Sequence, residues 1–192
     1  MPDIAQFHAL VRSCTRAPLL GGGKKRKLCI FLIMFLLSLK VFGQEDVLFS
    51  NNGYITFQNQ ELFILIVLVN DLQEAVNTWR IPNTTPTIYE TTMVKINEPI
   101  SLFIIYGTEN DSIDLTYNLR IREPNGAISE VKYDGLKISD VVISKRTLYP
   151  ANVMPTIVFD ENEEIGIYYF IIQVFDENEL IKTFILEFNL FA

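Results

Sequence analysis

The sequence predicts an all-β fold in which two antiparallel sheets, with about seven strands in total, pack face to face beside one short helix. Three observations predict it. Apolar and polar residues alternate over short segments, turn sequences such as Asn-Gly and Pro-Asn-Gly recur between them, and a single stretch has clear helical spacing. Because alternating strands must bury their apolar face, the pattern favours a sandwich.

The first 43 residues are predicted to form a secretory signal peptide. A basic cluster at residues 24–27 precedes an apolar run at residues 28–39, and Gly43 precedes the expected cleavage site at Gln44. The apolar run spans 12 residues, whereas a membrane-spanning helix needs about 20, so an uncleaved anchor is the weaker alternative. Because a signal peptide normally begins with its basic region, we expect the true start of translation to lie after Met1.

The chain beyond this leader is strongly acidic. Residues 44–192 carry nine Lys and Arg and 22 Asp and Glu, which gives a net charge of −13. Phosphate binding depends on clusters of Lys and Arg, so this charge argues against nucleic acids and anionic lipid surfaces as partners.

The residue types needed for several kinds of chemistry are missing from the same part of the chain. His8, Cys14 and Cys29 are the only histidine and cysteines, and all three precede Gly43. Ser-His-Asp and Cys-His catalytic sites, zinc sites built from these ligands and structural disulfides are therefore excluded from residues 44–192. We expect a protein that is not an enzyme and needs no cofactor.

Residues 44–61 are predicted to form an N-terminal extension or small hairpin, and residues 62–192 the sandwich. Asn51-Asn52-Gly53 lies between two short apolar stretches, and Asn-Gly accepts the positive φ angles of a tight turn. Further strands are expected at residues 62–69, 100–106, 113–122 and 128–133, whereas residues 134–150 alternate only weakly. About 149 residues are enough to bury a substantial core.

One short helix is predicted between Asp71 and Trp79. Asp71 is suited to cap the helix, and Glu74 stands at the capping-box position three residues later. Pro82 follows the helix and ends it. A helix this short needs tertiary packing, so we expect Trp79 to anchor it as a core residue; a role as a platform for a sugar ring is the weaker alternative.

Residues 165–191 predict a long β-hairpin around which the other strands are organised. Its two arms alternate, and the polar cluster at residues 176–179 forms the turn. The residues expected to face the core are Tyr168, Phe170, Ile172 and Val174 on the first arm and Phe184, Leu186, Phe188 and Leu190 on the second.

The opposite face of the first arm is the candidate interaction face. It carries Ile167, Tyr169, Ile171 and Phe175, which is more apolar surface than a water-facing sheet normally shows. Either the N-terminal hairpin or the short helix covers these side chains, or they bind a partner.

An acidic turn at residues 160–164 is the candidate metal site. Asp160, Asn162 and Glu164 alternate in the way that presents oxygen ligands to Ca²⁺. The segment differs from an EF-hand loop, because Ile165 replaces the required glycine and Ile171 replaces the final glutamate. A solvated acidic turn is therefore the default interpretation, and we expect no bound metal.

Several turn and core motifs resemble those of a group of small exported bacterial proteins of immunoglobulin-like fold, most of them uncharacterised. The likeness covers roughly residues 62–190 and rests on Trp79-x-x-Pro82, Glu98-Pro99-Ile100, Pro124-Asn125-Gly126, Gly166-x-Tyr168 and Leu186-Glu187-x-x-Leu190. The resemblance implies an immunoglobulin-like antiparallel β-sandwich, periplasmic or extracellular, with no catalytic residues. Gly166-x-Tyr168 is also similar to a tyrosine corner, although the inter-sheet disulfide of antibody domains is absent.

These observations predict an exported, non-catalytic binding or accessory module of the cell envelope, with an unknown protein or glycan partner. The alternative is a structural subunit or adhesin that assembles with itself or its neighbours, as a pilin-like domain completed by a partner strand. An outer-membrane barrel is disfavoured, because the predicted strands are shorter and fewer than spans of about 9 to 11 residues require.

Overall fold

The structure is a computed structural model that describes residues 47–81, 86–109, 113–139 and 147–192. The predicted leader, with its cleavage site between Gly43 and Gln44, lies outside the described residues. No helix among the residues that are described is long and apolar enough to cross a bilayer.

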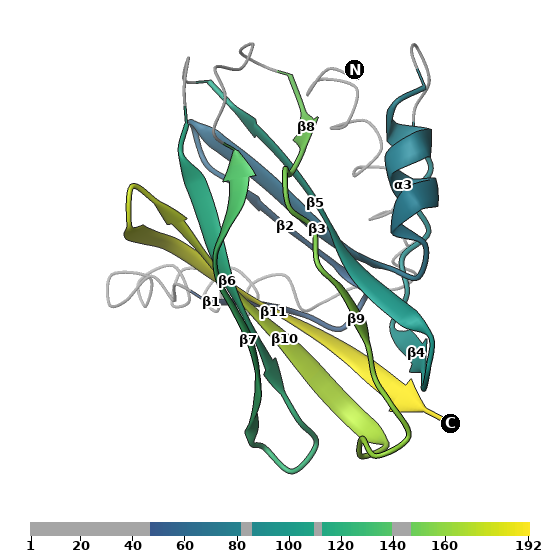
Figure 1. The fold of residues 1–192 in the computed structure, drawn as a ribbon. Coiled ribbons are helices and arrows are strands. Elements are labelled where there is room, and N and C mark those ends of the chain that lie inside the picture. Colours follow the sequence, from purple (N-terminus) through teal and green to yellow (C-terminus); the bar gives the residue numbers. More distant parts are fainter. Residues whose placement is uncertain (1–46, 82–85, 110–112, 140–146) are drawn as a thin grey trace, which may run out of the picture.

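Within these described ranges, eleven strands form two sheets that pack face to face (Figure 1). The six-stranded sheet has the order β1-β11-β10-β6-β7, with β4 also paired to β11. Its strands are β1 (Val47–Ser50), β4 (Met93–Lys95), β6 (Leu115–Arg122), β7 (Ile128–Ser139), β10 (Gly166–Asp176) and β11 (Glu179–Phe191). The five-stranded sheet has the order β2-β3-β5-β8, with β9 also paired to β5. Its strands are β2 (Tyr54–Gln58), β3 (Leu62–Val69), β5 (Pro99–Thr108), β8 (Tyr149–Pro150) and β9 (Thr156–Val158).

This arrangement confirms the predicted fold class, an immunoglobulin-like β-sandwich with one short helix. Seven of the eleven strands have five residues or more, which matches the number expected from the alternation. Most pairs are antiparallel, but β1 and β4 both run parallel to β11.

The closing hairpin is formed by β10 and β11, as predicted, and supplies much of the core. Gly166 pairs with Leu190 at its open end and Asp176 pairs with Glu179 beside the turn. The two turn residues, Glu177 and Asn178, have φ angles of 47° and 76°, as a tight two-residue hairpin turn requires. All eight residues expected to face the core are 1% exposed or less: Tyr168, Phe170, Ile172, Val174, Phe184, Leu186, Phe188 and Leu190.

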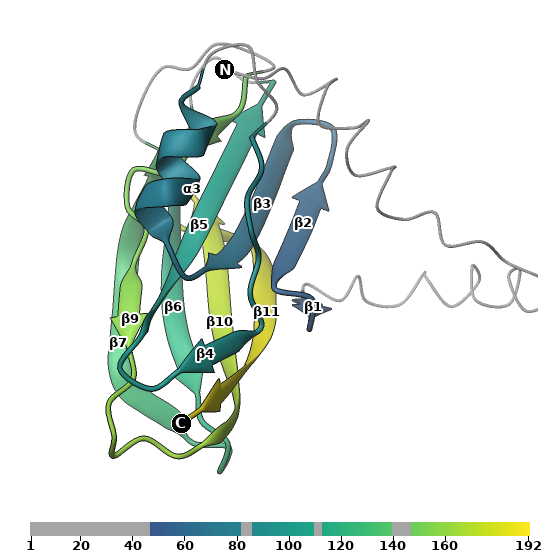
Figure 2. The same ribbon diagram turned by 90° about the vertical axis from the view of Figure 1, so that its right-hand side faces the viewer.

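The helix, α3 (Leu72–Trp79), covers the outer surface of the five-stranded sheet (Figure 2). The backbone N–H of Glu74 donates to Oδ1 of Asp71 at 2.8 Å, which confirms the predicted cap. Trp79 is 2% exposed and its ring lies 6.2 Å from that of Phe103 on β5, so it anchors the helix as expected. Because the helix covers its second face, β3 is buried on both sides.

The N-terminal hairpin is absent, because β1 and β2 belong to different sheets. β1 pairs with β11, whereas β2 pairs antiparallel with β3. The Asn-Gly pair therefore carries the chain from one sheet to the other and does not join two paired strands. Gly53 has a φ of 74°, and a Cβ atom there would lie 2.7 Å from the carbonyl oxygen of Thr91. Close approach of this backbone, as well as the positive φ, requires glycine.

The strand expected at residues 128–133 extends in the structure to Ser139. Its register against β6 shifts in three places, and Gly135 has a φ of 63°. Such bulges turn successive side chains off their regular face, which explains the weak alternation beyond Tyr133.

Candidate functional site

The four residues predicted as the interaction face lie together on the outer surface of β10. Ile167, Tyr169, Ile171 and Phe175 alternate along this strand with the buried core residues, so they face away from the other sheet. Ile167 is 47% exposed, and the other three are partly exposed. Their common orientation was predicted correctly; a binding role for them stays a prediction.

Neither of the two elements expected as covers lies over these residues. The helix packs on the opposite sheet, against Phe103 and Ile105 of β5. β1 joins the edge of the six-stranded sheet beside β11 and extends the same surface. Figure 1 shows the helix and the six-stranded sheet on opposite sides of the five-stranded sheet.

Two further apolar side chains from neighbouring strands complete this surface. Ile185 on β11 is paired with Ile171, and Phe49 on β1 is in turn paired with Ile185. Phe49 is 57% exposed, and its ring centroid lies 6.4 Å from that of Tyr169. We call the set formed by Phe49, Ile167, Tyr169, Ile171, Phe175 and Ile185 the apolar face.

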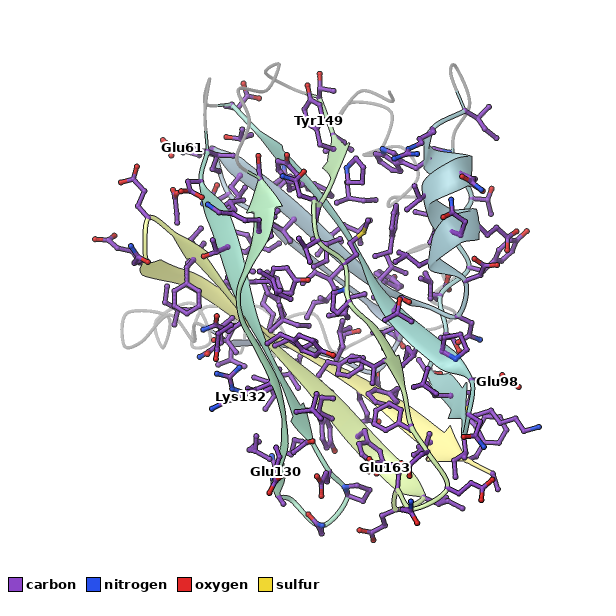
Figure 3. The ribbon with its side chains drawn as sticks, in the orientation of Figure 1. Glu61, Glu98, Glu130, Lys132, Tyr149 and Glu163 are labelled. Atoms are coloured by element: carbon purple, nitrogen blue, oxygen red, sulfur yellow. The ribbon has the colours of Figure 1, made fainter. Side chains whose placement is uncertain are left out.

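A group of cations borders the apolar face on the side of β6 and β7. Arg122 is paired with Tyr169 and Arg120 with Ile171, while Lys132 on β7 is opposite Arg120. Figure 3 labels Lys132 on the side of the molecule that faces away from the helix. We call Arg120, Arg122 and Lys132 the cationic margin.

The contacts of the two arginines differ. Arg120 donates to Oδ1 of Asp134 at 2.5 Å and to the carbonyl oxygen of Tyr133 at 3.1 Å, so neighbouring groups hold its guanidinium. The guanidinium carbon of Arg122 lies 5.8 Å from the centroid of the Tyr169 ring. Arg122 therefore joins the cationic margin to the apolar face through a cation–π contact.

The sequence contains only part of the signal for this site. Alternation places Arg120 and Arg122 on a polar strand face and the β10 residues on an apolar one. It does not say that β6 lies beside β10, and β1 has no local pattern that selects β11 as its partner. Phe49, Ile185 and the two arginines were therefore missed as site residues.

The candidate calcium turn is held by hydrogen bonds within the chain. The backbone N–H of Asn162 donates to Oδ1 of Asp160 at 2.7 Å, and the carbonyl oxygen of Glu164 accepts a hydrogen bond from the Tyr168 hydroxyl. All three candidate ligands are exposed. Within the described ranges, no group of three or more His, Cys, Asp or Glu residues is arranged to hold a metal ion.

Tyr168 forms the predicted tyrosine corner. Its hydroxyl donates to the carbonyl oxygen of Glu164 at 2.8 Å, four residues earlier. Its ring stacks on Phe188 with centroids 5.6 Å apart. Burial, together with the nearby carboxylate of Glu163, raises the pKa of Tyr168 to about 12, so the hydroxyl stays protonated at neutral pH. Its role is to fix the entry into β10.

Trp79 is too deeply buried to serve as a platform for a sugar ring. Its indole N–H is inaccessible to solvent and has no hydrogen-bond partner among the described residues. The helix it anchors also borders a hollow of about 210 Å³, lined in part by Asp71, Glu74 and Glu90. One oxygen of Asp71 is already used by the helix cap.

Comparisons with known proteins assign no family. No protein-family model and no curated protein matches the sequence. One similar structure is an alkylpurine DNA glycosylase of Pseudomonas fluorescens bound to DNA with an abasic site analog (14% identity, TM-score 0.35). The match covers 53% of this chain but only 28% of the glycosylase.

Two smaller proteins are similar over most of their own length. A Niemann-Pick type C2 protein from the Japanese carpenter ant has 7% identity and a TM-score of 0.39, with 74% of this chain and 96% of that chain covered. A CARDB domain from Pyrococcus furiosus, in complex with di-metal ions, has 10% identity and a TM-score of 0.33, with 53% and 81% covered. All three scores are below 0.5, so the ligands of these proteins are not transferred to this chain.

Proposed function

We propose that this chain is an exported, non-catalytic binding or accessory module of the cell envelope, periplasmic or extracellular, that binds a protein or glycan partner through the apolar face. The observation that carries the proposal is the apolar outer surface of β10, which neither β1 nor the helix covers, because exposed apolar patches with polar borders mark interaction sites. Export rests on the signal-peptide pattern and on the resemblance to small exported bacterial proteins.

The alternative, a subunit completed by a partner strand, has less support from the edges of the six-stranded sheet. The second edge of β11 is already paired with β1 and β4. At the other edge of the sheet, the register shifts along β7 disrupt the regular ladder that an added strand would extend.

Binding through the apolar face is tested by site-specific photo-crosslinking in the expressing bacterium. The full chain carries benzoylphenylalanine in place of Tyr169, and a control chain carries it in place of Tyr54, an exposed tyrosine on β2 of the other sheet. We expect a discrete adduct from position 169 that position 54 does not form. Equal adducts from both positions, or none from either, would refute the proposal.

Export is tested separately by mass spectrometry of the protein recovered outside the cytoplasm. We expect a chain that begins at Gln44. Retention of the full-length chain in the cytoplasm would contradict the predicted leader.

A further inference from the structure

Most of the apolar face is continuous across three adjacent strands of the six-stranded sheet, whereas Phe175 lies beyond Gln173 on β10. The pairing Phe49–Ile185–Ile171 crosses β1, β11 and β10 in one row. Tyr169 lies two residues from Ile171 on the same side of β10 and contacts Phe49 through its ring. These side chains form one patch and are not isolated exposed residues.

The composition of the patch favours a protein over a carbohydrate as its partner. Three of its six members, Ile167, Ile171 and Ile185, are aliphatic. Aliphatic side chains contribute to binding by losing contact with water, and they offer no hydrogen bonds to the hydroxyl groups of a sugar. A protein partner can bury its own apolar side chains against this surface, whereas the hydroxyl groups of a glycan would find no hydrogen-bond partners on the aliphatic side chains.

The charge of the cationic margin contrasts with the rest of the molecule. The described residues contain seven Lys and Arg and 18 Asp and Glu. Four of the seven cations lie on the adjacent strands β6 and β7: Arg120, Arg122, Lys132 and Lys137. Lys137 is paired with Asp114 and Arg120 with Asp134, which leaves Arg122 and Lys132 to attract an anionic group of a partner.

From these contacts we infer that the apolar face binds a second protein whose own apolar side chains are bordered by carboxylates, with those carboxylates placed against Arg122 and Lys132. This inference rests on the proposed function and specifies its partner. The acidic remainder of the surface repels the carboxylates of such a partner. Electrostatic attraction therefore favours the orientation in which the partner's carboxylates meet the cationic margin.

The test measures the charge dependence of binding to the protein that crosslinks at position 169. That protein is identified from the adduct by mass spectrometry and purified, and its dissociation constant is measured with the exported chain. We expect Arg122→Glu to weaken binding about tenfold, because it replaces one attractive charge pair at the edge of the interface with a repulsive one. Binding should also weaken between about 50 and 500 mM NaCl, because salt screens charges near the surface.

Two matched variants control this measurement. Arg122→Lys keeps the charge and should retain most of the affinity. Arg80→Glu reverses an exposed charge at the end of α3, on the opposite side of the molecule, and should have no effect. Urea unfolding of each variant checks that the fold is intact.

The possible outcomes separate the inference from the proposed function. An adduct with a glycan, or with a protein whose affinity does not respond to Arg122→Glu, would overturn the inference but leave a binding module. An adduct between two copies of the chain would also overturn it and would favour the structural-subunit alternative. Absence of any adduct specific to position 169 would refute the proposed function itself.

Discussion

The guanidinium group of Arg122 lies over the ring of Tyr169, with its central carbon 5.8 Å from the ring centroid. The two residues occupy paired positions on β6 and β10. A cation–π contact at an exposed site is worth about 0.5–1 kcal/mol, which is enough to orient both side chains without burying either. The contact therefore gives the outer surface of the sheet an ordered boundary between apolar and cationic side chains.

Removal of the Tyr168 hydroxyl should weaken the fold at neutral pH. Tyr168→Phe keeps the stacked ring and loses the hydrogen bond to the carbonyl oxygen of Glu164, so we expect a loss of about 1 kcal/mol in the free energy of unfolding. Urea unfolding at pH 7 measures this loss. An unchanged unfolding midpoint would show that the tyrosine corner contributes nothing to stability.

The same hydroxyl should make stability fall at alkaline pH. Tyrosine in an unfolded chain titrates near pH 10, whereas the folded-state pKa of Tyr168 is raised to about 12. Its contribution is complete below about pH 10 and is lost as the pH rises from there to about 12, because the unfolded state ionises first. Tyr168→Phe should therefore lose less stability than the wild type over this range. Burial also raises the pKa of Tyr117, so the stability of the Tyr168→Phe variant should still fall somewhat with rising pH.

Neutralisation of Asp176 should stabilise the protein at neutral pH. Burial, followed by the carboxylates of Glu177, Asp114 and Glu179, raises the pKa of Asp176 in the folded state. The unfolded carboxyl ionises first as the pH rises above about 4, so the folded state loses stability from there until its own pKa is passed. Asp176→Asn should be more stable than the wild type at pH 7 and equal to it below about pH 4. A less stable variant at pH 7 would contradict the assigned cost of burying the charged carboxylate of Asp176 beside these acidic groups.

Loss of the helix cap should cost a similar amount to loss of the tyrosine corner. Asp71→Ala removes the acceptor for the Glu74 backbone N–H and should lower the free energy of unfolding by about 1 kcal/mol. Asp71→Asn keeps an acceptor oxygen and serves as the control. Equal losses for both variants would show that the charge of Asp71, and not its capping bond, stabilises the helix.

The crossing between the two sheets at Gly53 should tolerate no side chain. Gly53→Ala places a methyl group against the carbonyl oxygen of Thr91 and keeps a positive φ. We expect it to destabilise the fold by about 1–3 kcal/mol more than Gly126→Ala, which has the same φ problem but no atom closer than 3.8 Å. Similar unfolding midpoints for the two variants would show that β1 and β2 can shift apart at little cost.

Local patterns in the sequence were enough to predict the closing hairpin, the Asp71 cap and the tyrosine corner. Each depends on residues within a few positions of one another, or on the two arms of one hairpin. The placement of β1 and β4 beside β11 depends on residues more than 90 positions away along the chain. Alternation in a four-residue strand does not select such a partner, and so the Asn-Gly pair was misinterpreted as a hairpin turn.

The candidate site shows the same division. The apolar alternation of β10 identified Ile167, Tyr169, Ile171 and Phe175, because a single strand contains them all. Phe49 and Arg122 reach the same surface only through the pairing of β1 with β11 and of β6 with β10. The polar border that suggests the chemistry of a partner therefore became visible only in the three-dimensional arrangement.

The central claim, that the outer surface of β10 is an interaction surface and not core, is tested most directly by the free energy of unfolding of Tyr169→Ser/Ile171→Ser. We predict a loss below about 3 kcal/mol with an unchanged denaturant slope, because both side chains are only partly buried. We also predict that the double variant loses its affinity for the protein identified from the adduct at position 169. The matched control is Phe170→Ser/Ile172→Ser, which alters the adjacent buried residues and should cost at least about 5 kcal/mol. A loss for the outer pair as large as that for the buried pair would contradict the claim and show that this face belongs to the core.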